Sequence, residues 1–211
     1  MDRNMSDIHI LELLSSKICH DLISPIGAIN NGVELLGEMG ADSGAEVTDL
    51  IAYSAQQASG KLQAYRMAYG AGGADANLKP EDVYNTFQAF IGGNEKLKQD
   101  WNPRAPLGPD PRPKGYCKIL MACLLQAADC LPKGGVISIA SSESGGTSVK
   151  ASGTDAAFKG DNLAALSLNL PQDKLDPKNI HAYVTGLMTK AYGFKISTQE
   201  EKGRCVTVTL S

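Results

Sequence analysis

The residues best suited to chemistry in this chain are a histidine, the acid that follows it and a lysine one helical turn before it. They are Lys17, His20 and Asp21, within the segment KICHDLISPIG. A neutral imidazole is a good nucleophile near physiological pH. The carboxylate can accept a hydrogen bond from the ring and orient it, and the ammonium can neutralise a transferred anion. These types suit group transfer through His20, although Asp21 and Lys17 can equally be solvated helix charges.

A long amphipathic helix is predicted to position these groups. At about 100° per residue, eight apolar residues fall on a single stripe, and His20 lies about 180° from the centre of that stripe. The stripe consists of Leu11, Leu14, Ile18, Leu22, Ile26, Ile29, Val33 and Leu36. We therefore expect His20 to face outward. Pro25 removes an amide hydrogen bond inside the helix, at a cost of about 3 kcal/mol, and is expected to bend it.

The segment ICHDLISPIG resembles the phosphoacceptor box of the dimerisation and histidine-phosphotransfer domain of two-component histidine kinases. The resemblance implies that His20 is the phosphoacceptor, Asp21 its acidic neighbour, Ser24 the polar residue one turn on and Pro25 the kink. With Lys17 added for its charge three residues before His20, the predicted catalytic set is His20, Asp21, Lys17 and Ser24.

Two helices, from about Ser6 to Met39 and from Glu46 to Tyr69, are predicted to form a hairpin through the turn GADSGA. The glycines and alanines of residues 70–74 indicate a helix stop and a linker, so residues 1–73 are expected to form one domain. A hairpin alone leaves much of both apolar stripes in water. A twofold homodimer that closes a four-helix bundle is the simplest completion. The alternative is that the hairpin packs on the rest of its own chain.

Residues 77–211 pattern as a second, mixed domain, which makes the predicted fold class α+β. Helices are expected over Pro80–Ile91, Cys117–Leu131 and Pro177–Tyr192, and the alternating runs VISIA, TSVKA, FKIST and CVTVTL are expected to be strands. The order of these elements resembles the catalytic ATP-binding domain of histidine kinases, an α/β sandwich.

The nucleotide-binding motifs of that domain are degenerate here. The two positions at which the family has magnesium-binding asparagines are occupied by Ala122 and Gln126. The DxGxG motif that binds the adenine base aligns with Ala151, Gly153 and Asp155. Of the glycine-rich lid, only Gly186 is present. Alanine cannot bind a cation, and one glycine provides no series of free amides for phosphates. We expect no ATP and no cofactor or metal bound to this chain.

Composition excludes several other classes. The chain has 211 residues, 43% of them hydrophobic, and a formal net charge of -3. Its basic residues are scattered, which is against nucleic-acid binding. The segment MDRNMSDIH lacks the charged and apolar regions of a signal peptide, so none is expected, and no apolar run is long enough for a membrane span. A cytoplasmic protein is expected. Five cysteines without CxxC spacing indicate neither disulfides nor zinc. Cys123 and Cys130 are predicted to be buried, and His9 and His181 to be core or idle surface residues.

The combination of a phosphoacceptor hairpin and a kinase-like domain with degenerate nucleotide-binding motifs resembles the ChpT family of histidine phosphotransferases. The run HDLISPIGAINNGVELL is its most specific part. The resemblance implies a phosphorelay in which His20 accepts a phosphoryl group from one response-regulator receiver domain and passes it to an aspartate of another, with magnesium supplied by the receiver. A receiver-binding scaffold without transfer and an ATP-dependent kinase are the alternatives.

The receiver is expected to dock on the same face of the first helix as His20. The residues assigned to this surface are Ile23, Ser24, Gly27, Ala28 and Asn31, with residues 63–67 of the second helix as a further candidate. Small residues there leave room for the backbone of a partner, and an apolar residue off the core stripe is typical of a contact surface.

Overall fold

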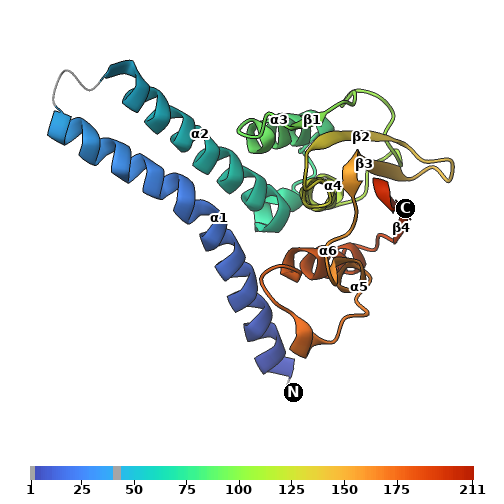
Figure 1. The fold of residues 1–211 in the computed structure, drawn as a ribbon. Helices are drawn as coiled ribbons and strands as arrows, with labels where there is room; N and C mark the ends of the chain where they lie inside the picture. The colour runs from blue at the N-terminus through green and yellow to red at the C-terminus, as the bar shows by residue number, and fades with distance from the viewer. Residues whose placement is uncertain (1–2, 40–43) are drawn as a thin grey trace.

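A computed structural model describes residues 3–39 and 44–211 of the chain. Two long antiparallel helices, α1 (Arg3–Met39) and α2 (Gly44–Tyr69), run side by side, and the end of this hairpin near the turn extends away from the remaining elements (Figure 1). The predicted hairpin is confirmed, although most of its turn lies outside the described residues. Gly32 permits close contact between the helices, since a Cβ atom there would lie 2.5 Å from a side-chain carbon of Ile51.

Helix α1 is continuous through Pro25, and its ribbon changes direction about midway along its length (Figure 1). The half before the proline packs on the rest of the chain. Ile10, Leu13 and Leu14 contact the apolar cluster around α5 (Asn162–Leu166) and α6 (Ile180–Ala191), and Ile18 contacts the main core.

Helix α2 packs on two helices of the second segment, α3 (Pro80–Ile91) and α4 (Tyr116–Asp129). A Cβ atom at Gly60 would lie 2.4 Å from the carbonyl oxygen of Ala89, so α2 and α3 approach closely because residue 60 is glycine. The expected linker is a 3-10 helix, η2 (Ala71–Ala74), in which Gly73 and Ala74 are buried. The alternative of packing within one chain therefore holds for part of the hairpin.

The second segment forms a five-stranded sheet with helices, one strand more than its pattern predicts. The strands are β1 (Leu97–Gln99), β2 (Gly135–Ser141), β3 (Thr147–Ala156), β4 (Ile196–Glu201) and β5 (Gly203–Leu210). They lie in the order β1-β2-β3-β5-β4; β1 and β2 are parallel and the other pairs antiparallel.

Several details differ from the sequence prediction. The short elements β1 and α5 were not expected, α6 begins at Ile180 rather than at Pro177, and β4 begins at Ile196 rather than at Phe194. A second 3-10 helix, η3 (Gln172–Lys174), precedes α6. Helix α4 is buried along most of its length because it contacts β2, β3 and β5 as well as α2, α3 and α6. Cys123 and Cys130 are buried as predicted, and burial raises the pKa of each thiol to about 12.

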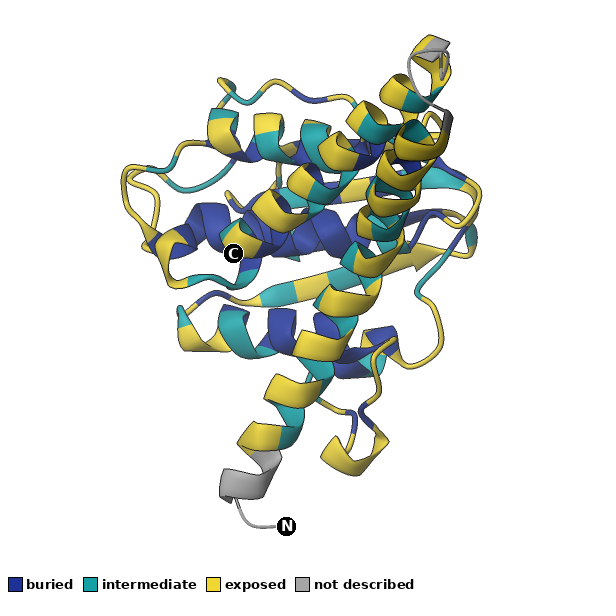
Figure 2. Cartoon of the chain, turned by 90° about the vertical axis from the view of Figure 1, so that its left-hand side faces the viewer, coloured by how far each residue is buried: buried dark blue, intermediate teal, exposed yellow. Residues whose placement is uncertain are grey.

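Many residues of the hairpin are exposed, as Figure 2 shows for α1 and α2 in front of the sheet domain. The exposed large apolar residues of these helices are Ile8, Leu11, Ile23, Ile26, Val33, Leu35, Leu50, Tyr53 and Leu62. So many large apolar side chains left in water on two helices indicate an interaction surface. None of the helices within residues 3–39 and 44–211 is apolar over a stretch that could cross a lipid bilayer.

Candidate functional site

His20 points away from the core, as its place opposite the apolar stripe predicts. The exposed fraction of its side chain is 86%. Ile23, Ser24 and Asn31 are exposed on the same helix, and Ala28 is half-buried. A Cβ atom added at Gly27 would have nothing within 4 Å, so a partner can approach the backbone there. The face of α1 assigned to docking is thus open in the described chain.

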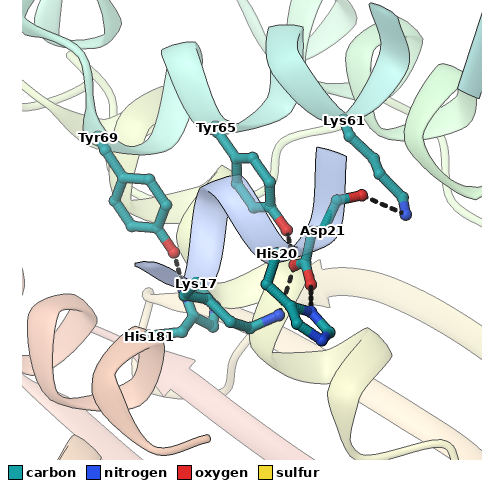
Figure 3. Close-up of polar contacts among 7 residues, drawn as sticks. All are labelled: Lys17, His20, Asp21, Lys61, Tyr65, Tyr69 and His181. Carbon is teal, nitrogen blue, oxygen red and sulfur yellow. Dashed lines mark hydrogen bonds and ion pairs between the residues drawn. The ribbon is translucent and has the colours of Figure 1, made fainter. Parts of the chain in front are cut away.

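Asp21 lies at the centre of a polar network that joins α1 to α2 (Figure 3). One carboxylate oxygen, Oδ1, lies 3.3 Å from Nδ1 of His20. The other, Oδ2, accepts hydrogen bonds from the ammonium of Lys17 and the hydroxyl of Tyr65. Burial alone would raise the pKa of the Asp21 carboxyl, but these bonds outweigh it and hold that pKa below its ordinary value. Asp21 is therefore ionised at neutral pH.

The backbone carbonyl of Asp21 is held as well, and Pro25 explains why. In an α-helix this carbonyl would accept from the amide of residue 25, but proline has no N–H. Nζ of Lys61, on α2, lies 3.0 Å from the freed oxygen and donates to it (Figure 3). Pro25 thus frees an acceptor next to His20, and a cation from the second helix occupies it.

Tyr65 and Lys61 were both missed as site residues by the sequence reasoning. Tyr65 falls within residues 63–67, the further docking candidate, but it is buried, with 8% exposed, and so does not belong to an open docking surface. Its ring lies 5.9 Å from that of Tyr69 and 6.4 Å from that of Phe90, centroid to centroid. Burial, together with the hydrogen bond to Asp21, raises the pKa of the Tyr65 hydroxyl, which stays protonated as a donor.

His181 is a satisfied core histidine, one of the two roles expected for it. Its Nε2 lies 3.2 Å from the carbonyl oxygen of Ala122. A carbonyl can only accept, so Nε2 carries the hydrogen and Nδ1 accepts from the hydroxyl of Tyr69. Burial lowers the pKa of His181. The neutral ring links α2, α4 and α6.

A cavity of about 630 Å³ opens beside His20, between α1 and the second segment. From α1 it is lined by Ser16, Lys17, His20 and Asp21, and from the rest of the chain by Asp129 and residues 159–162 and 176–179. Both loops precede helices, α5 and α6. The sequence predicts an open helix face for His20 and gives no sign of this second wall of the cavity.

The degenerate nucleotide positions lie in the packed interior. Ala122 and Gln126 are buried, and Oε1 of Gln126 has no hydrogen-bond partner in the described chain. Ala151 is buried in β3. Gly186 lies within α6, where a Cβ atom would be 2.3 Å from the carbonyl oxygen of Leu166, so close packing on α5 accounts for this glycine.

The remaining two positions have structural roles. A Cβ atom at Gly153 would lie 2.4 Å from the carbonyl oxygen of Gly134, which explains that glycine. Asp155 pairs with Lys133 at 2.6 Å on the surface.

Comparisons with known proteins agree with this architecture. Residues 80–204 match the family described as the histidine phosphotransferase C-terminal domain. The protein phosphotransferase ChpT of Brucella abortus (strain 2308) is 36% identical over 205 residues, which cover 92% of this chain and 91% of that protein. A solved structure, described as a 1.7 Angstrom structure of a bacterial phosphotransferase, matches with a TM-score of 0.78 and 29% identity over 97% of this chain and 96% of its own.

Proposed function

Because this chain belongs to the ChpT family of histidine phosphotransferases, we propose that it relays phosphoryl groups between response-regulator receiver domains through His20. The observation that carries the proposal is the pairing of an exposed imidazole with a fixed carboxylate. The side chain of His20 is 86% exposed, while Oδ1 of Asp21 lies 3.3 Å from its Nδ1. The ring is open to a partner at one nitrogen and oriented at the other.

In the tautomer with hydrogen on Nδ1, the ring donates to Asp21 and Nε2 keeps its lone pair. Nε2 attacks the phosphorus of an aspartyl phosphate, a P–N bond forms, and the P–O bond to the receiver's carboxylate breaks. The positive charge that develops on the ring is offset by Asp21. Transfer to a second receiver reverses these steps with a new aspartate as nucleophile. Most of the rate comes from docking that places the two residues in line across the phosphorus.

Magnesium and the aspartates belong to the receivers in this proposal. Lys17 lines the cavity beside His20 and is positioned to neutralise phosphoryl oxygens as well as Asp21. Ile23, Ser24, Gly27, Ala28 and Asn31 form the receiver-docking surface. Two observations support this surface: Ile23 is 68% exposed, and the space beside Gly27 is open.

A homodimer through the hairpin is part of the proposal. Exposed apolar residues of α1 and α2 other than Ile23 remain after the chain has packed on itself, and a second copy that closes a four-helix bundle would bury residues such as Ile26, Val33 and Leu50. Each apolar side chain fully buried contributes roughly 1.5 to 3 kcal/mol. Several such residues suffice to stabilise a symmetric interface.

Transfer without ATP is also proposed, and the burial of Ala122 and Gln126 supports it. A magnesium ion needs accessible oxygen ligands, and neither residue lines the cavity. A receiver-binding scaffold without transfer and an ATP-dependent kinase are the competing functions.

A two-step label transfer tests the function. Candidate receivers are phosphorylated with labelled phosphate, purified from the nucleotide, and mixed with this chain and then with unlabelled receivers. The label should pass to this chain and on to the second receiver, and His20→Ala should stop both steps. A scaffold would bind receivers without acquiring label, and a kinase would acquire label from ATP alone.

A further inference from the structure

We propose that Tyr65 is a positioning residue for phosphotransfer: its buried hydroxyl fixes the carboxylate of Asp21 so that Oδ1 faces His20. The inference rests on the proposed function of His20. It concerns a residue of α2 whose side chain reaches the site from outside the His20 helix (Figure 3).

A carboxylate is planar, so fixing one oxygen limits where the other can point. Oδ2 of Asp21 accepts hydrogen bonds from Tyr65 and Lys17. Oδ1, the other oxygen, then lies 3.3 Å from Nδ1 of His20. Without an external constraint, adjacent helical residues do not face each other. The contact between His20 and Asp21 therefore depends on what holds the acid from the other side.

Tyr65 is the more rigid of the two groups that hold Oδ2. Its ring is 8% exposed and packs between Tyr69 and Phe90. The side chain of Lys17 is 25% exposed and has a flexible stem. Tyr65 also belongs to another helix, so the orientation of the Asp21 carboxylate depends on the position of α2 relative to α1. Lys17 neutralises the charge of Asp21, and Tyr65 sets the orientation of the Asp21 carboxylate.

The chemical consequence is a fixed tautomer. An ionised Asp21 that points at Nδ1 favours hydrogen on that nitrogen and leaves Nε2 as the nucleophile. Tyr65 itself lies on the far side of Asp21 and needs no contact with the phosphoryl group. Its removal should therefore lower the rate of the chemical step and leave receiver affinity unchanged.

Tyr65→Phe removes the hydroxyl and keeps the packed ring. Tyr69→Phe is the matched control, because Tyr69 follows one turn later on α2 and its hydroxyl bonds His181 instead of Asp21. Two measurements apply to both variants as full-length protein. One is the ¹⁵N chemical shifts of the His20 ring, which report the tautomer; the other is single-turnover transfer at saturating receiver, with receiver affinity measured separately.

Tyr65→Phe should lose the preference for hydrogen on Nδ1 and transfer about 10-fold more slowly or worse, the scale typical of lost orienting partners, with receiver affinity unchanged. The acid limb of its rate should move to higher pH, since Asp21 loses a donor that lowers its pKa. Tyr69→Phe should keep the tautomer and most of the rate, even though it leaves a buried histidine without a partner.

A wild-type rate or an unchanged tautomer in Tyr65→Phe would overturn the inference, as would equal losses in both variants. The ¹⁵N measurement needs no phosphoryl donor. If the wild type failed to accept phosphate, the proposed function would fail while the tautomer comparison still judged the role of Tyr65.

Discussion

The hydrogen bond between Lys61 and the carbonyl of Asp21 should be required only because residue 25 is proline. Lys61→Met keeps most of the side-chain stem and removes the ammonium that lies 3.0 Å from that oxygen. A hydrogen bond to a charged group contributes about 1.5 to 3 kcal/mol. Lys61 is half-buried and gives up rotamer freedom, so we expect a net loss of about 1 kcal/mol in the free energy of unfolding.

Pro25→Ala supplies the missing amide and lets the helix satisfy the Asp21 carbonyl itself. In that background Lys61→Met should cost close to nothing, which gives a coupling energy of about 1 kcal/mol in a double-mutant cycle. Urea unfolding of the four proteins at one protein concentration measures it. Lys98→Met, at the exposed position of strand β1, is the control and should change stability equally in both backgrounds. An equal cost of Lys61→Met in both backgrounds would refute the reasoning.

Four further outcomes are expected. Calorimetry with magnesium-ATP should show no binding heat up to millimolar nucleotide, because Ala122 and Gln126 are buried. Binding at micromolar nucleotide would contradict the proposal that this domain does not use ATP. Gly27→Leu should weaken receiver binding and leave the dimer intact, because its side chain enters open space; unchanged affinity in a binding titration would remove Gly27 from the docking surface. Val33→Asp, at an exposed apolar position, should convert the dimer to a folded monomer in light scattering. Burial lowers the pKa of His181, so the unfolded chain binds a proton first as pH falls; stability should be full above about pH 6.5 and decline below it toward the folded pKa. This decline should be smaller in His181→Asn when both proteins are unfolded in urea at pH 7.5 and 5.5.

Helix periodicity predicted the features of the site that belong to one helix. The spacing of apolar residues along α1 placed His20 on the open face, and its side chain is 86% exposed. It also places Lys17 and Asp21 one turn apart on α1, and these two side chains form an ion pair in the structure. Such features follow from the rise and turn of a helix, which the local sequence determines.

The partners contributed by α2 could not be read from the same pattern. Tyr65 and Lys61 lie 44 and 40 residues from Asp21 in sequence, so only the packing of two helices brings them there. A tyrosine on an apolar stripe looks like core whether or not its hydroxyl has a function. One signal was available for Lys61: an interior proline always leaves a carbonyl to be satisfied, here that of Asp21.

The cavity beside His20 and the short elements β1 and α5 could not be predicted from the sequence for a related reason. Strand β1 has three residues and α5 has five, too few for a period to show. The loops that face His20 precede α5 and α6, and their position depends on how α6 packs against α1. Gly186 was compared with a nucleotide lid, but contact with Leu166 explains it without a ligand.

The most direct test of the whole account is to locate the phosphoryl group on this chain. After incubation with a phosphorylated receiver, the protein is digested under mildly alkaline conditions, which preserve phosphohistidine, and its peptides are analysed by fragmentation mass spectrometry. The account predicts one phosphorylated peptide, containing residues 18–27, with the group on His20 and none in the His20→Ala variant. Phosphate found on another residue, or retained in full by His20→Ala, would contradict it.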